Sequence, residues 1–235
     1  MNHSDHLITL RALALLLSYP DASLRSHLPD LRAALNANRR IPTVRQQELG
    51  ALIARLERSD SVATEAEYVE LFDCGRATSL HLFEHVHGDS RDRGPAMIDL
   101  VQTYEKAGLY LAPDELPDYL PTVLEFVSTQ PEAEARAFLG EMAHILNAIF
   151  NALQKRQSLY ASVLGTLLEL CGEKAHAVKV ATDEPLDSAW EEPVVFDGCS
   201  VKGQSATPAV LPIHIVRTEA SQSRAQHPAM TGAPL

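Results

Sequence analysis

Apolar residues recur every three to four positions over most of residues 7–170, which is the spacing of one face of a helix. Segment 7–17 is apolar almost all round, so we expect a helix that is buried on most of its sides. Further helices are expected to begin near residues 21, 45, 61, 78, 92 and 116. No segment before residue 190 alternates apolar and polar residues with a period of two, so a central sheet is not expected.

Turn-forming residues mark where the first helix ends and where the second begins. Tyr19-Pro20 ends the first, because the residue before a proline is displaced from the helical backbone region. Asp21 or Ser23 is suited to cap the second helix. Pro29 falls inside the second helical pattern, and we expect it to split that helix.

From residue 132 to about 170 the helical pattern continues, with a turn near 155–158, which predicts two antiparallel helices joined by a short connection. The sequence therefore predicts an all-α protein with a single helical-bundle domain over residues 1–180. The composition changes after Lys179. Residues 181–217 are expected to form an extended tail that packs on the helical body, and residues 218–235 are expected to be disordered.

The charge balance narrows the class of partner. The chain carries a formal net charge of −11, which argues against nucleic acid, because phosphate binding needs a basic surface. A basic partner is the better electrostatic match. The chain has no apolar run of membrane-spanning length and no signal-peptide pattern at its start, so we expect a cytoplasmic protein that does not insert into the membrane. Its three cysteines are too scattered for a disulfide framework or a CxxC metal site.

The densest group of chemically active side chains lies in residues 81–94, which contain three histidines and two arginines. His81, Glu84 and His85 match the H-x-x-E-H pattern, in which two histidines on one helix face bind zinc and the glutamate acts as general base. Such a site needs a third ligand, for which Glu169 or Glu173 stands at a plausible separation. This interpretation predicts a metal-dependent hydrolase. Such an enzyme also needs an α/β fold that holds an extended substrate, whereas no sheet is expected here.

Two other interpretations of the same residues stay open. Joined with His87 and Asp89, the histidines His81 and His85 form a set of imidazole and carboxylate ligands that suits a metal-dependent phosphohydrolase. Alternatively, the histidines end a helix and satisfy nearby carbonyls and acids, while Asp89 caps the next helix.

A longer set of residues resembles a known family. It comprises Tyr68-Val-Glu-Leu-Phe72-Asp73, residues 79–94, Ala96-Met97 and Glu115-Leu-Pro-Asp-Tyr-Leu-Pro121 with Leu124-Glu-Phe126. In order and spacing these stretches resemble the NarJ-type nitrate reductase assembly chaperones, within the TorD/DmsD-like redox-enzyme maturation proteins. With Tyr19-Pro20 and parts of the tail, the resemblance covers most of residues 7–217. Cys74-Gly75 departs from the family pattern, where bulkier or charged residues are expected, and this departure is expected to loosen the join to the cluster.

The resemblance implies an all-helical chaperone that is not an enzyme. Its client would be the N-terminal segment of the apo catalytic (alpha) subunit of respiratory nitrate reductase, held ready for molybdenum cofactor insertion before membrane anchoring. No permanently bound cofactor is implied, only transient contact with bis-molybdopterin guanine dinucleotide through the client. Molybdenum cofactor biosynthesis proteins are further partners that the family suggests. We expect a monomer or a weak homodimer.

The residues expected to contact the client peptide combine an apolar groove, a polar rim and the histidines. They are Tyr68, Phe72, Asp73, His81, Glu84, His85, His87, Asp89, Arg91, Met97, Leu100, Tyr104, Leu116, Asp118, Leu120 and Leu124. The groove would take the apolar face of a partner helix, although the same helical spacing also suits a plain core. The rim carboxylates would meet basic groups of the client, and the histidines would make binding depend on pH.

A second set of residues is expected to shape the loop and the helix caps: Arg76, Gly88, Arg93, Gly94, Pro117 and Pro121. The arginines near the cluster are expected to pair with Asp73 or Asp89, and the alternative is that they receive a phosphate-bearing cofactor. Two function classes compete with the chaperone. They are the metal-dependent hydrolase that uses His81, Glu84 and His85, and a helical scaffold without a specific client.

Overall fold

The computed structural model describes residues 3–88, 90–113 and 115–173. These residues form ten α-helices and one short 3-10 helix: α1 (His3–Leu17), α2 (Ala22–Ala37), α3 (Thr43–Arg58), α4 (Ser61–Phe72), η1 (Arg76–Thr78), α5 (Leu82–Val86), α6 (Arg93–Lys106), α7 (Leu120–Thr129), α8 (Glu132–Glu141), α9 (Ala143–Lys155) and α10 (Ala161–Cys171). Within these ranges the only strand-like pairing is one antiparallel bridge between His81 and Tyr119. The predicted all-α class is confirmed.

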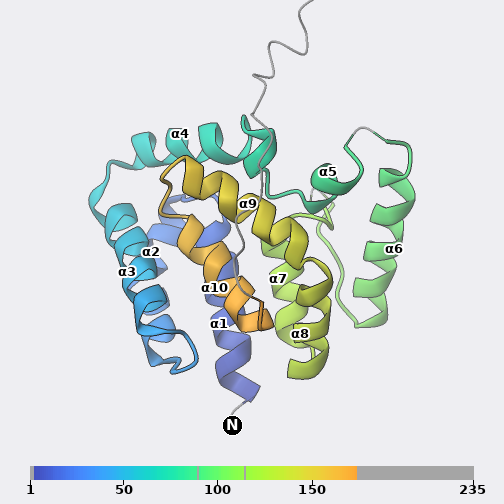
Figure 1. Cartoon of the computed structure of the whole chain (residues 1–235), viewed down its shortest axis with the longest axis horizontal. Coiled ribbons are helices and arrows are strands. Elements are labelled where there is room, and N and C mark those ends of the chain that lie inside the picture. Colours follow the sequence, from blue (N-terminus) through green and yellow to red (C-terminus); the bar gives the residue numbers. More distant parts are fainter. Residues whose placement is uncertain (1–2, 89, 114, 174–235) are drawn as a thin grey trace, which may run out of the picture. The chain divides into compact units, whose positions relative to one another are not determined.

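Helix α1 lies at the centre of the bundle, as its nearly uniform apolar sequence predicted. Leu10, Leu13, Leu16 and Leu17 are completely buried, and each buried leucine contributes on the order of 2 kcal/mol of hydrophobic stabilisation. The helix packs mainly against α7, and also against α2 and α10. Figure 1 shows α1 and α7 behind α10 and α9, with the α2–α3 pair to one side.

The second helix confirms one predicted boundary and corrects another. Asp21 caps α2, because its carboxylate accepts a hydrogen bond of 2.7 Å from the backbone N–H of Leu24. Pro29 lies inside α2 and does not split it, so that expectation was wrong. The buried stripe that includes Leu28 and Leu31 holds the helix against the core on both sides of the proline, which offsets the missing backbone hydrogen bond.

The segment from residue 132 to 171 contains three helices rather than the predicted pair. The chain bends at Met142, where α8 ends and α9 begins. The Met142 carbonyl accepts hydrogen bonds from the N–H groups of Ile145 and Leu146, which starts the new helix. Both helices carry buried residues at helical spacing, so the apolar pattern runs through the bend without a break. The short α9–α10 connection near residue 157 agrees with the predicted turn.

The join between α4 and η1 is tight, which corrects the expectation that Cys74-Gly75 loosens it. Gly75 is buried, and a Cβ there would meet Thr78 Oγ1 and lie 2.8 Å from the carbonyl oxygen of Leu71. The Thr78 hydroxyl donates to the Leu71 carbonyl across this turn. Only glycine permits so close an approach.

In the described ranges no helix is both long and apolar enough to cross a membrane. The predictions for the extended tail over 181–217 and for disorder over 218–235 fall outside the described residues. Of the cysteines, Cys74 is exposed and Cys171 is buried.

Candidate functional site

The candidate site is built around the carboxylate of Asp118, which precedes α7 and is completely buried. Its Oδ2 accepts a hydrogen bond of 3.1 Å from the backbone N–H of Phe83. Its main-chain oxygen accepts another, of 3.0 Å, from the N–H of Leu82. Both donors lie in the first turn of α5, where backbone N–H groups have no partner within the helix. Asp118 therefore caps α5 from a segment more than thirty residues further along the chain.

Backbone pairing fixes this arrangement. The N–H of Leu120 donates to the carbonyl of Leu80 at 2.8 Å, and His81 and Tyr119 form the antiparallel bridge. The rings of His81 and Tyr119 also contact each other, with centroids 5.3 Å apart. The start of α7 is thus joined to the start of α5 by hydrogen bonds on both sides of Asp118.

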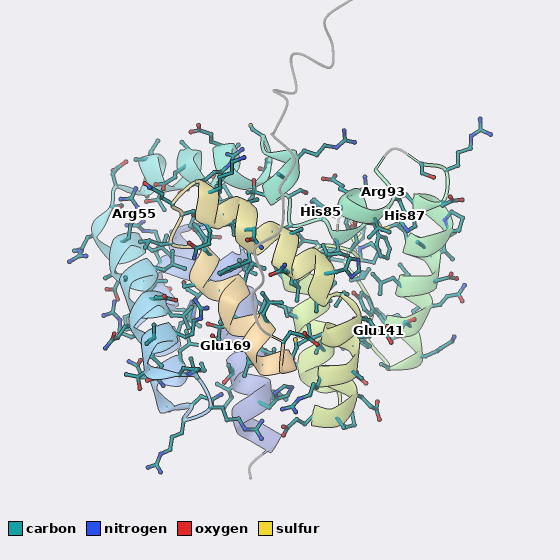
Figure 2. All side chains as sticks on the ribbon, in the orientation of Figure 1. Arg55, His85, His87, Arg93, Glu141 and Glu169 are labelled. Carbon is teal, nitrogen blue, oxygen red and sulfur yellow. The ribbon has the colours of Figure 1, made fainter. Side chains whose placement is uncertain are left out.

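A histidine and an arginine face the buried carboxylate. His81 Nδ1 lies 3.5 Å from Asp118 Oδ1, and neither atom has a closer hydrogen-bond partner. The nearby carboxylate of Asp118 raises the pKa of His81 above its ordinary value, although burial of the ring acts in the opposite direction. Arg93 Nη2 lies 3.7 Å from Asp118 Oδ2 and 3.4 Å from Glu84 Oε1. Two acids and two bases therefore balance each other where α5 meets α6, and Figure 2 labels Arg93 at this junction.

A line of tyrosine hydroxyls connects this junction to the central helix. The hydroxyls of Tyr119 and Tyr68 lie 3.0 Å apart, and Tyr68 donates a hydrogen bond of 2.6 Å to the carbonyl of Leu17. That carbonyl belongs to the last turn of α1, where helix carbonyls lack a partner within the helix. Burial raises the pKa of Tyr68 and Tyr119, so both hydroxyls stay neutral at physiological pH and keep their roles as donors.

Helix α6 is the least buried element of the junction. Tyr104 is its only buried residue among fourteen. The Tyr104 hydroxyl donates a hydrogen bond of 2.7 Å to the carbonyl of Pro117, and its ring contacts Phe126 with centroids 4.7 Å apart. Tyr104 near one end of α6 and Arg93 at the other therefore hold this helix against the rest of the bundle, at whose edge it lies in Figure 1.

Apolar side chains remain accessible along α6 and its neighbours. We use the term α6 surface for Val86, Met97, Ile98, Leu100 and Leu116. Val86, Ile98 and Leu116 are 51%, 59% and 46% exposed, and the other two are half-buried. The three exposed side chains lie on α5, on α6 and in the segment before α7, and they are candidates for contact with a partner.

Comparisons with known proteins identify the family. The family model described as "Nitrate reductase delta subunit" matches residues 21–164. The chain belongs to the nitrate reductase delta subunit family. One relative is the nitrate reductase molybdenum cofactor assembly chaperone NarJ of Escherichia coli K12, which is 42% identical over 196 residues, covering 79% of this chain and 83% of NarJ. A second relative, NarW of the same strain, is 38% identical over 193 residues, covering 78% of this chain and 80% of NarW.

Among solved structures, a chain from Archaeoglobus fulgidus described as a redox enzyme maturation protein matches with a TM-score of 0.50 at 22% identity. The match covers 71% of this chain and 94% of that one, and it supports the helical fold alone. Membership of the delta subunit family confirms the NarJ-type resemblance. It also identifies the chain as a chaperone rather than an enzyme.

The structure corrects the apolar groove that was expected for this family member. The residues expected to line the groove were Tyr68, Phe72, Met97, Leu100, Tyr104, Leu120 and Leu124. All of these except Met97 and Leu100 belong to the core, and each of those five is at most 4% exposed. They pack inside the bundle because helical spacing alone does not distinguish a groove from a core. Of the expected groove, only Met97 and Leu100 have accessible surface. A partner helix therefore has no open groove at the predicted position in this conformation.

The polar rim is corrected at one position. Asp118 is not a rim residue, because its carboxylate is buried and is used inside the protein. Asp73 and Arg91 are exposed, and Glu84 is engaged by Arg93. Asp89 lies outside the described residues, so its predicted roles as a cap, ligand and client contact are not described.

The hydrolase alternative finds no support in the geometry. His81 precedes α5 instead of lying on it, and its Nδ1 faces Asp118. His85 Nε2 lies 2.8 Å from the Ser79 carbonyl, and since a carbonyl only accepts, Nε2 carries the proton and offers no lone pair to a metal. Among residues 3–88, 90–113 and 115–173, no group of three His, Cys, Asp or Glu side chains is arranged to hold a metal ion.

The residues expected to shape the loop are distributed over the same junction. Gly88 has a positive φ of 51°, a conformation that favours glycine. Pro117 supplies the carbonyl that Tyr104 binds, and Pro121 lies in the first turn of α7. Gly94 lies in the first turn of α6, and Arg76 is exposed. His87 is half-buried, and its ring contacts that of Phe83.

Sequence reasoning missed several residues of the junction. Tyr119 contributes both the bridge to His81 and the hydroxyl contact to Tyr68, and Ile98 and Val86 are exposed apolar residues of the α6 surface. The apolar residues of α6 at helical spacing are Met97, Leu100, Val101 and Tyr104. Ile98 lies outside this set, which was an available sign that it faces solvent. No pattern in the sequence indicates the pairing of residues 80–82 with 118–120.

Proposed function

We propose that this protein is an assembly chaperone that binds the N-terminal segment of the apo catalytic subunit of a respiratory nitrate reductase. It keeps that subunit ready for molybdenum cofactor insertion in the cytoplasm, before membrane anchoring. The cofactor is cargo for the client, and this chain contacts it only transiently and through the client. The relative NarJ, named as the molybdenum cofactor assembly chaperone of nitrate reductase, supports the class of partner, and molybdenum cofactor biosynthesis proteins are partners of the same assembly step.

The observation that carries the proposal is the α6 surface on a weakly buried helix. A client helix that lays its apolar face on Ile98 and its neighbours removes their side chains from water, and full burial of one such side chain contributes about 1.5–3 kcal/mol. Because α6 buries only Tyr104, it can shift to fit its partner at a small cost in packing. The client is thereby bound on the outside of α6 instead of in an interior groove.

Charge supports a cationic client segment. Asp99 and Glu105 are exposed carboxylates on α6, and Asp73 is another at the end of α4. In a chain with a net charge of −11, these groups attract a basic peptide and raise its association rate more than its final affinity. The proposal therefore predicts that added salt slows association.

The experiment that tests the proposal is calorimetric titration of the full chain with a peptide copying the N-terminal segment of the nitrate reductase catalytic subunit of the same organism. We expect saturable binding near one to one, and we expect Ile98→Asp to weaken it at least about tenfold, which corresponds to about 1.4 kcal/mol. The matched control is Val62→Asp, since Val62 is 72% exposed on α4 and should leave binding unchanged.

Two results would contradict the proposal. If the unmodified chain does not bind the peptide, the client segment is wrong. If Ile98→Asp and Val62→Asp bind as tightly as the unmodified chain, the client is bound away from the α6 surface.

A further inference from the structure

Helix α4 carries apolar side chains on its outer face as well as on its inner one. The inner face consists of the buried residues Thr64, Tyr68, Leu71 and Phe72. On the opposite face, at helical spacing, Val62 and Val69 are 72% and 36% exposed, and Ala66 between them is exposed as well. A helix that borders water ordinarily presents polar side chains there. The apolar outer face of α4, at the upper edge of the bundle in Figure 1, therefore suits a partner.

The ring of Tyr19, from the turn between α1 and α2, lies beside this outer face. Its hydroxyl donates a hydrogen bond of 2.9 Å to Glu65 Oε2 on α4, and its ring packs edge-on against Tyr68 with centroids 5.6 Å apart. These contacts hold the ring in place, yet Tyr19 is 44% exposed. Ordered tyrosine rings of this kind often anchor contacts between proteins. We use the term α4 surface for Tyr19, Val62, Ala66 and Val69.

The charges that act most strongly on the Tyr19 hydroxyl are all negative. The hydrogen bond to Glu65 raises its pKa most, and the nearby carboxylates of Asp21 and Asp73 raise it further. Helix α4 itself contains no lysine or arginine. Arg76 follows Asp73 closely in the chain, but its Nη2 lies beside Gly88. The α4 surface is therefore bordered by acids.

The arginines that precede α4 in the chain are engaged elsewhere. Arg25 Nη2 donates a hydrogen bond of 2.7 Å to the carbonyl of Ser59, and its Nη1 is buried. Arg55, labelled in Figure 2, pairs at 2.6 Å with Glu67 instead of with the acids near Tyr19. Arg58 Nε donates to a carbonyl of its own helix. The acids beside Tyr19 thus remain available to a cation from outside.

We infer that the α4 surface docks an amphipathic helix of another protein, one that carries an arginine among its apolar residues. Apolar side chains of that helix cover the two valines and the alanine, in the helix-on-groove manner that uses anchors three and four positions apart. Its guanidinium stacks on the exposed part of the Tyr19 ring. It also pairs with Asp21 and Glu65, each of which keeps one carboxylate oxygen outside its hydrogen bond. This inference goes beyond the proposed function, because the contact needs no residue of the α6 surface.

The test is an NMR titration of the full chain at low salt. The probe is a peptide with blocked ends that repeats Ala-Ala-Arg-Leu, and a second peptide has citrulline, which has nearly the shape of arginine without its charge. We expect saturable binding that shifts the amide signals of Tyr19 and of the outer face of α4, with a several-fold preference for the arginine peptide. Tyr19→Leu keeps an apolar side chain without the aromatic face, so it should weaken binding of the arginine peptide about threefold.

A double variant isolates the charges. Asp21→Asn with Glu65→Gln removes both carboxylates but keeps the oxygens that cap α2 and accept from Tyr19. It should reduce the preference for arginine over citrulline about fivefold. The matched double variant is Asp30→Asn with Glu134→Gln, which removes the same charge from exposed positions on α2 and α8. This control should keep the full preference.

Four results would overturn the inference. The first is the absence of saturable binding by the unmodified chain, and the second is a set of shifted amide signals that excludes α4. The third is an unchanged preference for arginine in Asp21→Asn with Glu65→Gln. The fourth is displacement of the probe by the client peptide, since the two would then share one site.

Discussion

Replacing Asp118 by asparagine separates the charge of this side chain from its shape. Asparagine retains an oxygen that accepts the hydrogen bond from Phe83 N–H, so the cap of α5 is preserved in form. It removes the negative charge that faces His81 at 3.5 Å and Arg93 at 3.7 Å. The variant therefore leaves the Arg93 guanidinium beside a buried neutral group, and it removes the charge that favours the protonated form of His81.

The structure sets the size of the effect. At an effective dielectric constant of 20, charges 3.7 Å apart interact by about 4 kcal/mol before screening. His81 and Arg93 have side chains that are 30% and 27% exposed, so water weakens both interactions, and the variant also avoids the cost of burying the Asp118 charge. We therefore expect Asp118→Asn to lower the free energy of unfolding by about 2–3 kcal/mol. For a bundle of this size, the melting temperature should fall by about 5–10 °C.

Urea unfolding followed by circular dichroism measures this loss. Asp30→Asn is the matched control, because Asp30 is exposed on α2, and it should change stability by less than about 0.5 kcal/mol. If Asp118→Asn is as stable as the control, the carboxylate charge contributes nothing to the junction, and the account of Asp118 as its centre is wrong.

Two further predictions concern the same junction. Because the pKa of His81 is raised in the folded protein, protonated His81 stabilises the fold fully below about pH 6.5, and this contribution is lost as pH rises through the raised pKa. The measurement is urea unfolding at several pH values. The free energy of unfolding should fall less with rising pH in His81→Asn than in the unmodified chain. An equal pH dependence of the two proteins would contradict the pairing of His81 with Asp118. Tyr104→Phe removes the hydrogen bond to the Pro117 carbonyl, so it should cost about 1 kcal/mol and speed amide hydrogen exchange in α6. Unchanged exchange there would show that Tyr104 does not tether α6.

Local patterns predicted most of the helical frame. The leucine stripe of α2 and its cap at Asp21 depend on residues three or four positions apart, so a short window contains all the information. The same local rule failed at Pro29, where packing of Leu28 and Leu31 outweighs the preference of a single residue. It also failed at Met142, where two helices with apolar faces meet and the periodicity carries on through the bend.

The candidate site depends on contacts that no short window contains. Asp118 looked like a surface acid between turn-forming residues, yet it is buried because Phe83 and Leu82, far earlier in the chain, offer unpaired N–H groups. The expected groove failed for the opposite reason. Tyr68 and Phe72 lie at spacing that suits either a groove or a core, and their contacts with the distant ring of Tyr160 decide for the core.

Mutations that abolish client binding can act in two ways, either by disturbing the buried junction around Asp118 or by removing a contact on the α6 surface. Asp118 is inaccessible, so a partner cannot touch it, and its loss acts on binding only by displacing α5 and the start of α6. Ile98 is exposed and contributes little to the core, so its replacement should remove client contacts without changing the unfolding curve. A variant that loses stability and client affinity together therefore reports on the junction, whereas one that loses affinity alone reports on the α6 surface. Measuring both quantities for Asp118→Asn and Ile98→Asp distinguishes a residue that positions the client site from one that belongs to it.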